Sequence, residues 1–470
     1  MISTGDVINL NIDSAAFEGK GVGRINGFVV FVPYAVPGDV VEARVTRRRR
    51  DYAEARILKV IQPSAYRREP KCRYSGICGG CRWQQLDYEK QAEYKRQHVI
   101  DALQRIGNIQ TDVLPIIKSD QEYAYRNKIE LTFSDNPYRI SDNDDSKVSL
   151  GFHAPGRFDR TIDIEHCDLV DERMNEIIRW FREYIDPRHA ERVKPTLSIY
   201  NSLRHEGVLR FLVIRKSFAT QEIMVLLFVY RIEEGLEILS QKLKSDLPYV
   251  SSFVTIVNPT LSQVASGNVQ NVHFGSGYIT DKIGELKFRI SPLSFFQTNT
   301  LQAQKLYSVV SAAIEREVDT IYDLYSGTGS IACYLSTKAK NITGFEMVES
   351  AVEDAKTNAR LNGITNVEFV KANLDELFKF KDDSLIQLKD MSLPEIIVLD
   401  PPRSGIHPKI AQNLHKLNAR KIIYVSCNPM TQARDVREIL AHGYRPVYCQ
   451  PVDMFPQTYH VENVLVLERD

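Results

Sequence analysis

Cys427 is the residue whose type and surroundings most strongly indicate chemistry. It directly follows the apolar run KIIYVS at residues 421–426 and precedes Asn428 and Pro429. Proline cannot donate to a strand ladder, so Pro429 ends the strand and fixes a turn beside the thiol. A thiol presented there can serve as a covalent nucleophile, whereas a free cysteine is usually only a small hydrophobic side chain. We predict that Cys427 is catalytic.

Two carboxylates occupy comparable places in the last part of the chain. Asp400 closes the apolar run EIIVLD, and the two prolines that follow it hold a rigid turn. Glu462, in TYHVENVLVLER, begins the last predicted strand and is a candidate base for proton removal, with His460 as a weaker candidate. The alternatives are a helix cap for Asp400 and a surface carboxylate for Glu462. We predict that both acids face the crevice that holds Cys427.

A glycine-rich loop indicates a nucleotide-like cofactor. Residues 323–332, DLYSGTGSIA, match G-x-G-x-x-A, a pattern in which glycine permits a tight turn and close approach of the backbone to a ligand. Glu346 ends the next predicted strand, 23 residues after Asp323, where an acid can bind two ribose hydroxyls. These residues alone suit NAD or S-adenosylmethionine. The rigid turn at Asp400 favours S-adenosylmethionine, because hydride transfer does not need it.

The cysteines favour metal binding or catalysis over disulfides. Their number is odd, and the long chain begins without an apolar signal segment. The seven cysteines are Cys72, Cys78, Cys81, Cys167, Cys333, Cys427 and Cys449. The first three lie in a glycine-rich loop, and Cys167 is a candidate fourth member of that set. Spacing alone leaves zinc and an iron–sulfur cluster open.

Residues 1–62 are predicted to form a small β-barrel. Short β-rich runs at residues 7–12, 28–32, 40–45 and 55–61 are separated by Gly, Pro and Asp. About five such strands make an OB-like barrel, a common platform for oligonucleotides. Residues 41–82 hold twelve Lys and Arg against four Asp and Glu. This surplus favours contact with a polyanion over the alternative of a solvated basic face.

Residues 63–290 are predicted to form a central domain of mixed strands and helices. A helix over 88–106 follows the cysteine loop, with Asp87 as its N-cap and Gly107 as its stop, and is a candidate to pack on the third domain. Its apolar face comprises Ala92, Val99, Leu103 and Ile106. Strands are predicted at residues 129–133, 197–200, 209–215 and 222–230.

Residues 291–470 are predicted to form an α/β domain of the Rossmann-like type. Short apolar runs alternate with helical stretches, as in a doubly wound, mainly parallel sheet. Ligands of such sheets bind at the carboxyl ends of the strands, where Asp400 and Cys427 fall. No run of the chain reaches the ~20 apolar residues that span a bilayer, and the N-terminus resembles no signal peptide. We expect a cytoplasmic protein that has no membrane partner.

The ordered motifs of the C-terminal part resemble those of the uridine-5 RNA methyltransferase family. They are SPLSFFQTN, DLYSGTGSIA, GFE, LDPPRSG, VSCNP and HVEN, and the similarity covers nearly the whole chain. The resemblance implies that Gln297, Tyr325, Glu346 and Asp400 contact S-adenosylmethionine, and that Ser330 and Asn373 occupy less consistent cofactor positions. It also implies that Cys427 is the nucleophile and Glu462 the base, and that Phe295 and Arg403 hold the target base or shape its pocket.

The chemistry of that family explains the use of a thiol. Carbon 5 of uracil is a poor nucleophile, and addition of a thiolate to carbon 6 turns it into an enolate-like centre that can attack a methyl sulfonium. A base then removes the proton from carbon 5, and the thiol leaves. Arg126 and Lys128, in YRNK, are predicted to add contacts to RNA phosphates.

The front half of the chain is similar to the same family. Residues 1–62 resemble a TRAM domain, an OB-like RNA-binding module. The resemblance implies that Cys72, Cys78, Cys81 and Cys167 ligate a structural [4Fe–4S] cluster. A chain with both a TRAM domain and a cluster resembles the members of this family that act on 23S ribosomal RNA, which is the predicted substrate. No obligate protein partner is predicted.

Three alternatives compete with this function. The first is a transfer-RNA uridine-5 methyltransferase. The second is a non-catalytic RNA-binding ribosome assembly factor, against which the intact Cys427, Asp400 and Glu462 argue. The third is a radical methylthiotransferase, which needs a tight C-x3-C-x2-C loop, whereas five residues separate Cys72 from Cys78.

Overall fold

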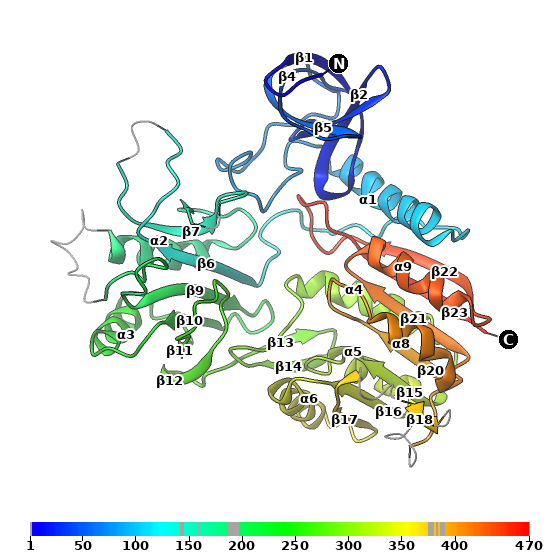
Figure 1. The fold of residues 1–470 in the computed structure, drawn as a ribbon. Coiled ribbons are helices and arrows are strands. Elements are labelled where there is room, and N and C mark those ends of the chain that lie inside the picture. Colours follow the sequence, from blue (N-terminus) through cyan, green and yellow to red (C-terminus); the bar gives the residue numbers. More distant parts are fainter. Residues whose placement is uncertain are drawn as a thin grey trace.

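The computed structural model describes residues 2–141, 145–157, 159–186, 197–374, 380–381, 384–385 and 391–469. The elements form a barrel, a central sheet and a C-terminal sheet, which follow one another along the chain (Figure 1). No helix in the described ranges is long and apolar enough to cross a membrane.

The predicted N-terminal barrel is confirmed. Its five strands close in the order β1-β2-β3-β5-β4. Alternate residues of β3 and β4, among them Val30, Val32, Val41 and Ala43, are fully buried and form the barrel core, as the two-residue period of a strand requires. The elements are β1 (Val7–Ala15), η1 (Phe17–Gly19), β2 (Lys20–Ile25), β3 (Phe28–Pro33), β4 (Val40–Arg48) and β5 (Tyr52–Gln62).

Helix α1 (Tyr88–Ala102) joins the front of the chain to the C-terminal sheet. It begins at Asp87, whose carboxylate accepts a hydrogen bond of 3.0 Å from the backbone N–H of Glu89. It continues as the π-helix η2 (Leu103–Gly107) and ends at Asn108, which adopts a left-handed conformation. The predicted N-cap at Asp87 and the predicted end of the helical run at Gly107 are confirmed, with Asn108 as the left-handed residue that follows. A Cβ at Gly107 would lie 2.6 Å from the side chain of Ile109 and 3.1 Å from the carbonyl oxygen of Ala433. Its lack of a side chain lets η2 pack closely on α9 (Pro429–Leu440).

The central region is a seven-stranded sheet in the order β12-β11-β10-β9-β6-β7-β8. Only β10 and β11 pair in parallel; the other neighbours are antiparallel. Its strands and helices are β6 (Lys128–Ser134), β7 (Ser149–His153), β8 (Thr161–Asp163), α2 (Glu172–Ile185), β9 (Leu209–Lys216), β10 (Ile223–Val229), α3 (Gly235–Asp246), β11 (Ser252–Val257) and β12 (Asn268–Phe274). The predicted strand at 197–200 is wrong: the tight turn at 201–206 leaves room for only isolated bridges there, Ile199 with Leu209 and Asn201 with Glu206.

The hairpin of β13 (Ile279–Ile283) and β14 (Leu286–Ile290) packs on the C-terminal elements. Its buried residues belong to the same apolar core as α4 (Thr300–Ala312) and α6 (Glu349–Leu361). The backbone N–H of Arg289 donates to the side chain of Asn358 on α6 at 2.8 Å. The hairpin therefore supports the region that begins at residue 291.

The predicted mainly parallel C-terminal sheet is confirmed. Its order is β17-β16-β15-β20-β21-β23-β22, and only β23 and β22 run antiparallel to their neighbours. The remaining elements are β15 (Val318–Leu324), α5 (Ser330–Tyr334), η4 (Ser336–Lys338), β16 (Ala339–Glu346), β17 (Val367–Lys371), β18 (Phe380–Lys381), β19 (Ser384–Leu385), β20 (Ile396–Leu399), α8 (Pro408–Asn413), η5 (Leu414–Leu417), β21 (Lys421–Ser426), β22 (Arg445–Val452) and β23 (Glu462–Glu468). The chain passes outward from β15 to β17 and returns to β20 beside β15, so the strand order reverses between β15 and β20. A ligand crevice is expected there, outside the carboxyl ends of the strands.

Candidate active site

A pocket of about 980 Å³ opens at the carboxyl ends of β15, β16, β20 and β21. Segments that are far apart in the sequence line it, from residue 126 to residue 462. It brings together ten predicted site residues: Arg126, Phe295, Gln297, Tyr325, Glu346, Asn373, Asp400, Arg403, Cys427 and Glu462. Its position matches the crevice expected from the reversal of strand order.

Cys427 lies between the end of β21 and the start of α9. Asn428 caps α9 by accepting a hydrogen bond of 3.1 Å from the N–H of Met430, and its own N–H donates to the hydroxyl of Ser426 at 3.1 Å. Burial raises the pKa of the Cys427 thiol to about 12, and the charges of Glu462 and Asp400 act in the same direction. A positive charge in the pocket would favour the thiolate.

Glu462 and Asp400 are the two acids whose charges raise the pKa of this thiol. Glu462 is 4% exposed, and its burial, together with the charge of Asp400, holds its pKa well above the usual range. Burial raises the pKa of Asp400 to about 7. A raised pKa makes a carboxylate a stronger base once it is ionised, so this environment suits proton removal by Glu462.

The glycine loop is preformed around Glu346. The carboxylate of Glu346 accepts hydrogen bonds from the N–H of Gly327 at 3.0 Å and of Val348 at 2.8 Å. Tyr325 adopts a left-handed conformation with φ 66° at the mouth of the loop. At Gly329 a Cβ would lie 2.4 Å from the ring of Phe369, so only glycine fits. Beneath the loop, the fully buried Asp323 accepts from the N–H of Ala332 at 3.2 Å.

Besides the four cysteines predicted to hold a cluster, two predicted site residues lie outside the pocket lining. The hydroxyl of Ser330 is 2.8 Å from that of Tyr307, because the start of α5 directs this side chain toward α4. The ammonium of Lys128 lies 3.4 Å from Glu130 on the same strand. The geometry therefore gives neither residue a direct contact with a ligand of this pocket.

The YRNK segment positions the pocket wall. The side-chain amide of Asn127 donates to the carbonyl oxygen of Gln297 and to the hydroxyl of Thr300, both at 2.8 Å. Its N–H donates to the carbonyl oxygen of Thr298 at 2.8 Å. Next to it, the N–H of Arg126 donates to the carbonyl oxygen of Leu169. The segment thus ties the wall at residues 295–300 to the stretch that carries Cys167.

The sequence did not identify Phe455 as a site residue, and it indicated His460 only as a weaker candidate base. Both lie in the connection between β22 and β23 and line the pocket. Burial, with the charge of Arg403 as the next cause, lowers the pKa of His460 to about 3, so this imidazole is a weak proton acceptor. Their signal in the sequence was only their proximity to Glu462.

Aromatic and arginine side chains gather at the mouth of the pocket. Phe295 is 66% exposed. Arg403 donates to the hydroxyl of Tyr459 at 3.2 Å, and the Tyr459 ring lies 5.6 Å from the guanidinium of Arg82 and 5.7 Å from the ring of Phe17. The barrel, the cysteine loop and the C-terminal region therefore meet at this rim, which offers stacking surfaces and positive charge.

The four predicted cluster ligands come together beside Arg126. Burial is the largest cause that raises the thiol pKa of all four cysteines. The charges of Cys167 and Cys78 further raise the pKa of Cys72 and of Cys81, and the charge of Cys78 raises that of Cys167. Among the described residues, no three His, Cys, Asp or Glu side chains are grouped as the ligands of a metal ion.

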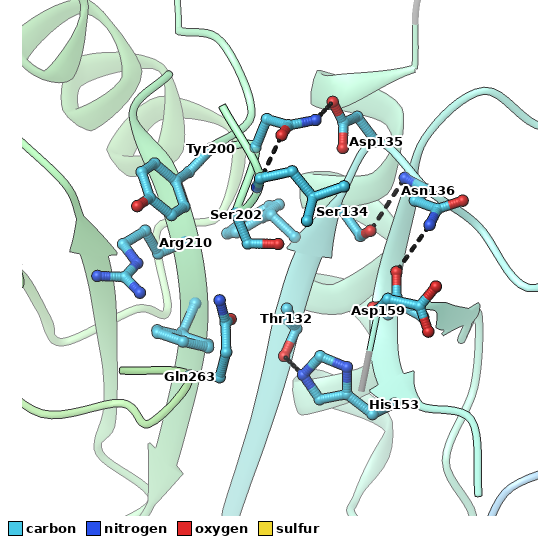
Figure 2. A pocket seen from close by; sticks show the side chains of 15 residues that line it. Thr132, Ser134, Asp135, Asn136, His153, Asp159, Tyr200, Ser202, Arg210 and Gln263 are labelled. Atoms are coloured by element: carbon cyan, nitrogen blue, oxygen red, sulfur yellow. Dashed lines mark hydrogen bonds between the residues drawn. The ribbon is translucent and has the colours of Figure 1, made fainter. Parts of the chain in front are cut away.

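A second, much smaller pocket lies in the central sheet, away from this chemistry (Figure 2). Its volume of about 40 Å³ suits one or two water molecules rather than a nucleotide. Internal contacts occupy several of its polar groups: Asn136 donates to the carbonyl oxygen of Asp159 at 2.9 Å, and Arg210 donates to three backbone carbonyl groups and lies 4.6 Å from the ring of Tyr200. We assign no ligand to it.

Comparisons with known proteins agree with this geometry. The family model described as tRNA (Uracil-5-)-methyltransferase matches residues 87–470, and that of the TRAM domain matches residues 3–58. An uncharacterized RNA methyltransferase of Chlorobaculum tepidum is 40% identical, over 99% of this chain and 97% of the relative. Another, from Bacteroides thetaiotaomicron, is 37% identical over 96% and 99% of the two chains. The structure is similar to that of Pyrococcus abyssi tRNA (uracil-54, C5)-methyltransferase in complex with S-adenosyl-L-homocysteine, with a TM-score of 0.74, 28% identity and coverage of 98% and 100%.

Proposed function

Because this chain belongs to the tRNA (uracil-5-)-methyltransferase family and is an RNA methyltransferase, we propose that it methylates carbon 5 of a uridine by covalent catalysis. One observation carries the proposal: Cys427, Asp400 and Glu462 line one pocket beside the glycine loop. A thiol and a buried base are the two groups that this chemistry demands. Hydride transfer with NAD, the alternative that the glycine loop left open, does not require a nucleophilic thiol beside a buried base.

The cofactor side of the pocket fits S-adenosylmethionine. Glu346 lies where a carboxylate can accept from ribose hydroxyls, and Gln297, Tyr325, Asn373 and Asp400 line the adjoining wall. When bound, S-adenosylmethionine supplies a methyl group activated by a sulfonium centre, whose positive charge favours the ionised forms of Asp400 and Cys427. The raised pKa of both groups is consistent with a site that is completed by a cationic ligand.

The side chains of the pocket divide the reaction between them. Once ionised, the Cys427 thiolate would add to carbon 6 of the uracil, and the displaced electron pair would move to carbon 5. Bound S-adenosylmethionine would supply the methyl group to carbon 5, and its sulfur would keep the electron pair of the methyl–sulfur bond. Glu462 then takes the proton from carbon 5. The electrons of that C–H bond restore the double bond between carbons 5 and 6, and the Cys427 thiolate leaves.

The rim supports recognition of an extruded base. Flipping a uridine out of folded RNA costs a few kcal/mol, and stacking on an aromatic side chain returns about 1–3 kcal/mol per base. The exposed ring of Phe295 and the guanidinium of Arg403 are the groups at the mouth that can supply this contact. Arg126, deeper in the pocket, can meet a phosphate or a base edge.

We keep 23S ribosomal RNA as the proposed substrate, with transfer RNA as the second candidate. The TRAM barrel and the four-cysteine set, proposed to hold a structural [4Fe–4S] cluster, support the ribosomal substrate by resemblance. The family description and the Pyrococcus abyssi structure favour transfer RNA. The proposed units are a TRAM domain at 1–62, a cluster-containing domain at 63–290 and a methyltransferase domain at 291–470.

Nucleoside mass spectrometry tests both levels of the proposal. Purified protein and S-adenosylmethionine are incubated with unmodified 23S ribosomal RNA and, separately, with transfer RNA. New 5-methyluridine in the ribosomal sample alone is the expected result. New 5-methyluridine in transfer RNA alone would keep the reaction and replace the substrate. Absence from both, with the cofactor bound, would favour the assembly-factor alternative.

A further inference from the structure

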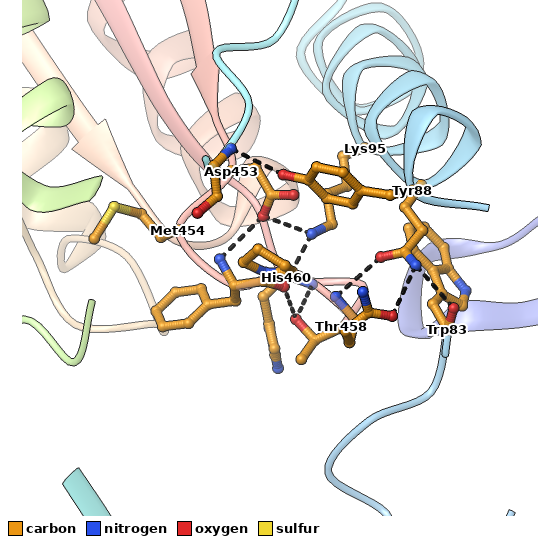
Figure 3. Close-up of polar contacts among 12 residues, drawn as sticks. Trp83, Tyr88, Lys95, Asp453, Met454, Thr458 and His460 are labelled. Carbon is orange, nitrogen blue, oxygen red and sulfur yellow. Dashed lines mark hydrogen bonds and ion pairs between the residues drawn. The ribbon is translucent and has the colours of Figure 1, made fainter. Parts of the chain in front are cut away.

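A fully buried ion pair joins α1 to the region of the proposed base (Figure 3). The ammonium of Lys95 lies 2.6 Å from a carboxylate oxygen of Asp453, and neither side chain is exposed. The two residues are 358 positions apart in the sequence. Lys95 stands on the buried face of α1 between Ala92 and Val99, where an apolar residue would be expected.

The partner of Lys95 starts the β22–β23 connection, residues 453–461. Lys95 also donates to the carbonyl oxygen of Phe455 at 3.0 Å, and Asp453 accepts from the N–H of Phe455 at 3.0 Å. The two members of the ion pair therefore hold both the N–H and the carbonyl oxygen of Phe455. The residues that flank the connection, Val452 and Glu462, are held opposite each other, because they pair across β22 and β23.

Further contacts, from α1 and from Tyr125, hold the same connection. The side chain of Gln91, one turn before Lys95 on α1, accepts from the N–H of Gln457 at 2.9 Å and donates to its side-chain oxygen at 3.1 Å. The hydroxyl of Tyr125 donates to the carbonyl oxygen of Pro456 at 2.9 Å. The connection presents Phe455 and His460 to the pocket and leads into Glu462.

We propose that Lys95 is a positioning residue for proton removal: paired with Asp453, it holds the β22–β23 connection so that Glu462 meets the proton on carbon 5. This inference deepens the proposed function and rests on it. A helix from the front half of the chain thereby completes the catalytic geometry of the C-terminal region. Burying two charges stabilises a fold poorly, since an apolar pair of similar volume does as well. The directional contacts to Phe455 are what an apolar pair could not supply.

The test is whether loss of Lys95 stalls the reaction at the step that Glu462 performs. Lys95→Met is incubated with S-adenosylmethionine and ordinary uridine-containing substrate RNA, and covalent protein–RNA complex is measured on denaturing gels. We expect at least a tenfold lower kcat, a KM for RNA within about twofold of wild type, and accumulation of the methylated covalent complex. Glu462→Gln serves as the positive control for accumulation. Rapid release of RNA by Lys95→Met, with no accumulated complex, would overturn the proposal.

Two lysine variants separate positioning from stability. Lys421, 3% exposed, sits at the start of β21, at the opposite end of that strand from Cys427, and its ammonium donates to the carbonyl oxygen of Ala313 at 2.7 Å. Lys421→Met should lower the melting temperature without accumulating complex. Lys90→Met, at a solvent-accessible pair with Glu93 on α1, should change neither quantity. Accumulation in Lys421→Met would mean that general destabilisation produces the stall, which would contradict the proposal.

The double variant Lys95→Met/Asp453→Leu keeps the test decisive if Lys95→Met folds poorly. It removes both buried charges, so the melting temperature should recover toward wild type. Because Phe455 still lacks its partners, the covalent complex should still accumulate. Recovery of turnover together with stability would assign the pair to folding alone and overturn the proposal.

RNA that contains 5-fluorouridine distinguishes failure of this inference from failure of the proposed function. Fluorine on carbon 5 leaves no proton to remove, so wild-type protein should be trapped as a covalent complex. If wild type forms that complex and Lys95→Met turns over normally on uridine RNA, only the positioning role is wrong. If wild type forms none, the covalent mechanism itself fails.

Discussion

The pocket at the carboxyl ends of the C-terminal strands surrounds its ionisable groups with protein, whereas the basic edge of the barrel exposes its charges. The basic edge comprises Arg47, Arg48, Arg49 and Arg50, which follow the last buried residue of β4 and are all exposed. In the pocket, burial is the largest cause of the pKa shifts of Asp400, Cys427 and Glu462.

This difference has consequences for how each region tolerates change. A buried group interacts strongly with few neighbours, so its loss removes one chemical step. An exposed charge is screened by salt and acts as one of several, so its loss weakens binding by degrees. Substitutions in the pocket should therefore act on single steps of the reaction, and substitutions on the basic edge should act additively on RNA affinity.

Replacement of Cys427 gives the largest expected effect. Cys427→Ala removes the covalent route, and turnover measured by methyl transfer from labelled cofactor should fall by at least about 10⁴-fold. Cofactor affinity should stay within about threefold of wild type, because the thiol is not a predicted cofactor contact. Cys333→Ala, at a buried helix residue outside the pocket, is the matched control. Full activity of Cys427→Ala would remove the distinction between the two regions.

The cysteine set provides the next largest effect. Protein purified without oxygen should contain iron and acid-labile sulfide, and Cys81→Ser should lose both. The free energy of unfolding should fall by about 2–5 kcal/mol, the range for a lost cross-link between distant segments. The melting temperature and the iron content check this result, and Cys449→Ala is the control, since its thiol contacts Asn463 instead. Zinc without sulfide would replace the proposed cluster by a single-ion site.

Local sequence patterns were enough to predict where the C-terminal strands end and where α1 begins. The same patterns predicted most of the pocket residues. Asp400, Cys427 and Glu462 each stand where an apolar run stops or begins, and the parallel sheet brings such positions to one edge. Lys95 and Asp453 carry no such pattern, because partners 358 residues apart are chosen by tertiary packing. The local anomaly, a lysine on the apolar face of a helix, was nevertheless visible in the sequence.

Asp400 should give the pocket a pH-dependent cofactor affinity. Its carboxyl has a pKa of about 7 in the free protein, and a sulfonium ligand favours the ionised form. Affinity should therefore be highest above pH 7 and fall by up to about tenfold for each pH unit below it. Calorimetric titration with the cofactor from pH 5.5 to 8.5 measures this, and Asp400→Asn should bind more weakly with a flat profile. A slope that survives in Asp400→Asn would assign it to another acid, with Glu462 as the first candidate.

The smallest expected effect belongs to the basic edge, and it should be graded. Each exposed arginine that neutralises a phosphate contributes at most about 0.7 to the slope of log affinity against log salt for single-stranded RNA. Replacing Arg47–Arg50 together by Ser should lower that slope by up to about 3, and each single replacement should lower it by a fraction of this. Filter binding across a salt series measures the slope, and the saturating rate of methyl transfer should remain near that of wild type because no pocket residue has changed. An unchanged slope would place the RNA elsewhere on the molecule. A lost saturating rate would instead mean that the barrel acts on the chemistry, and the contrast between collective exposed charge and individual buried groups would fail.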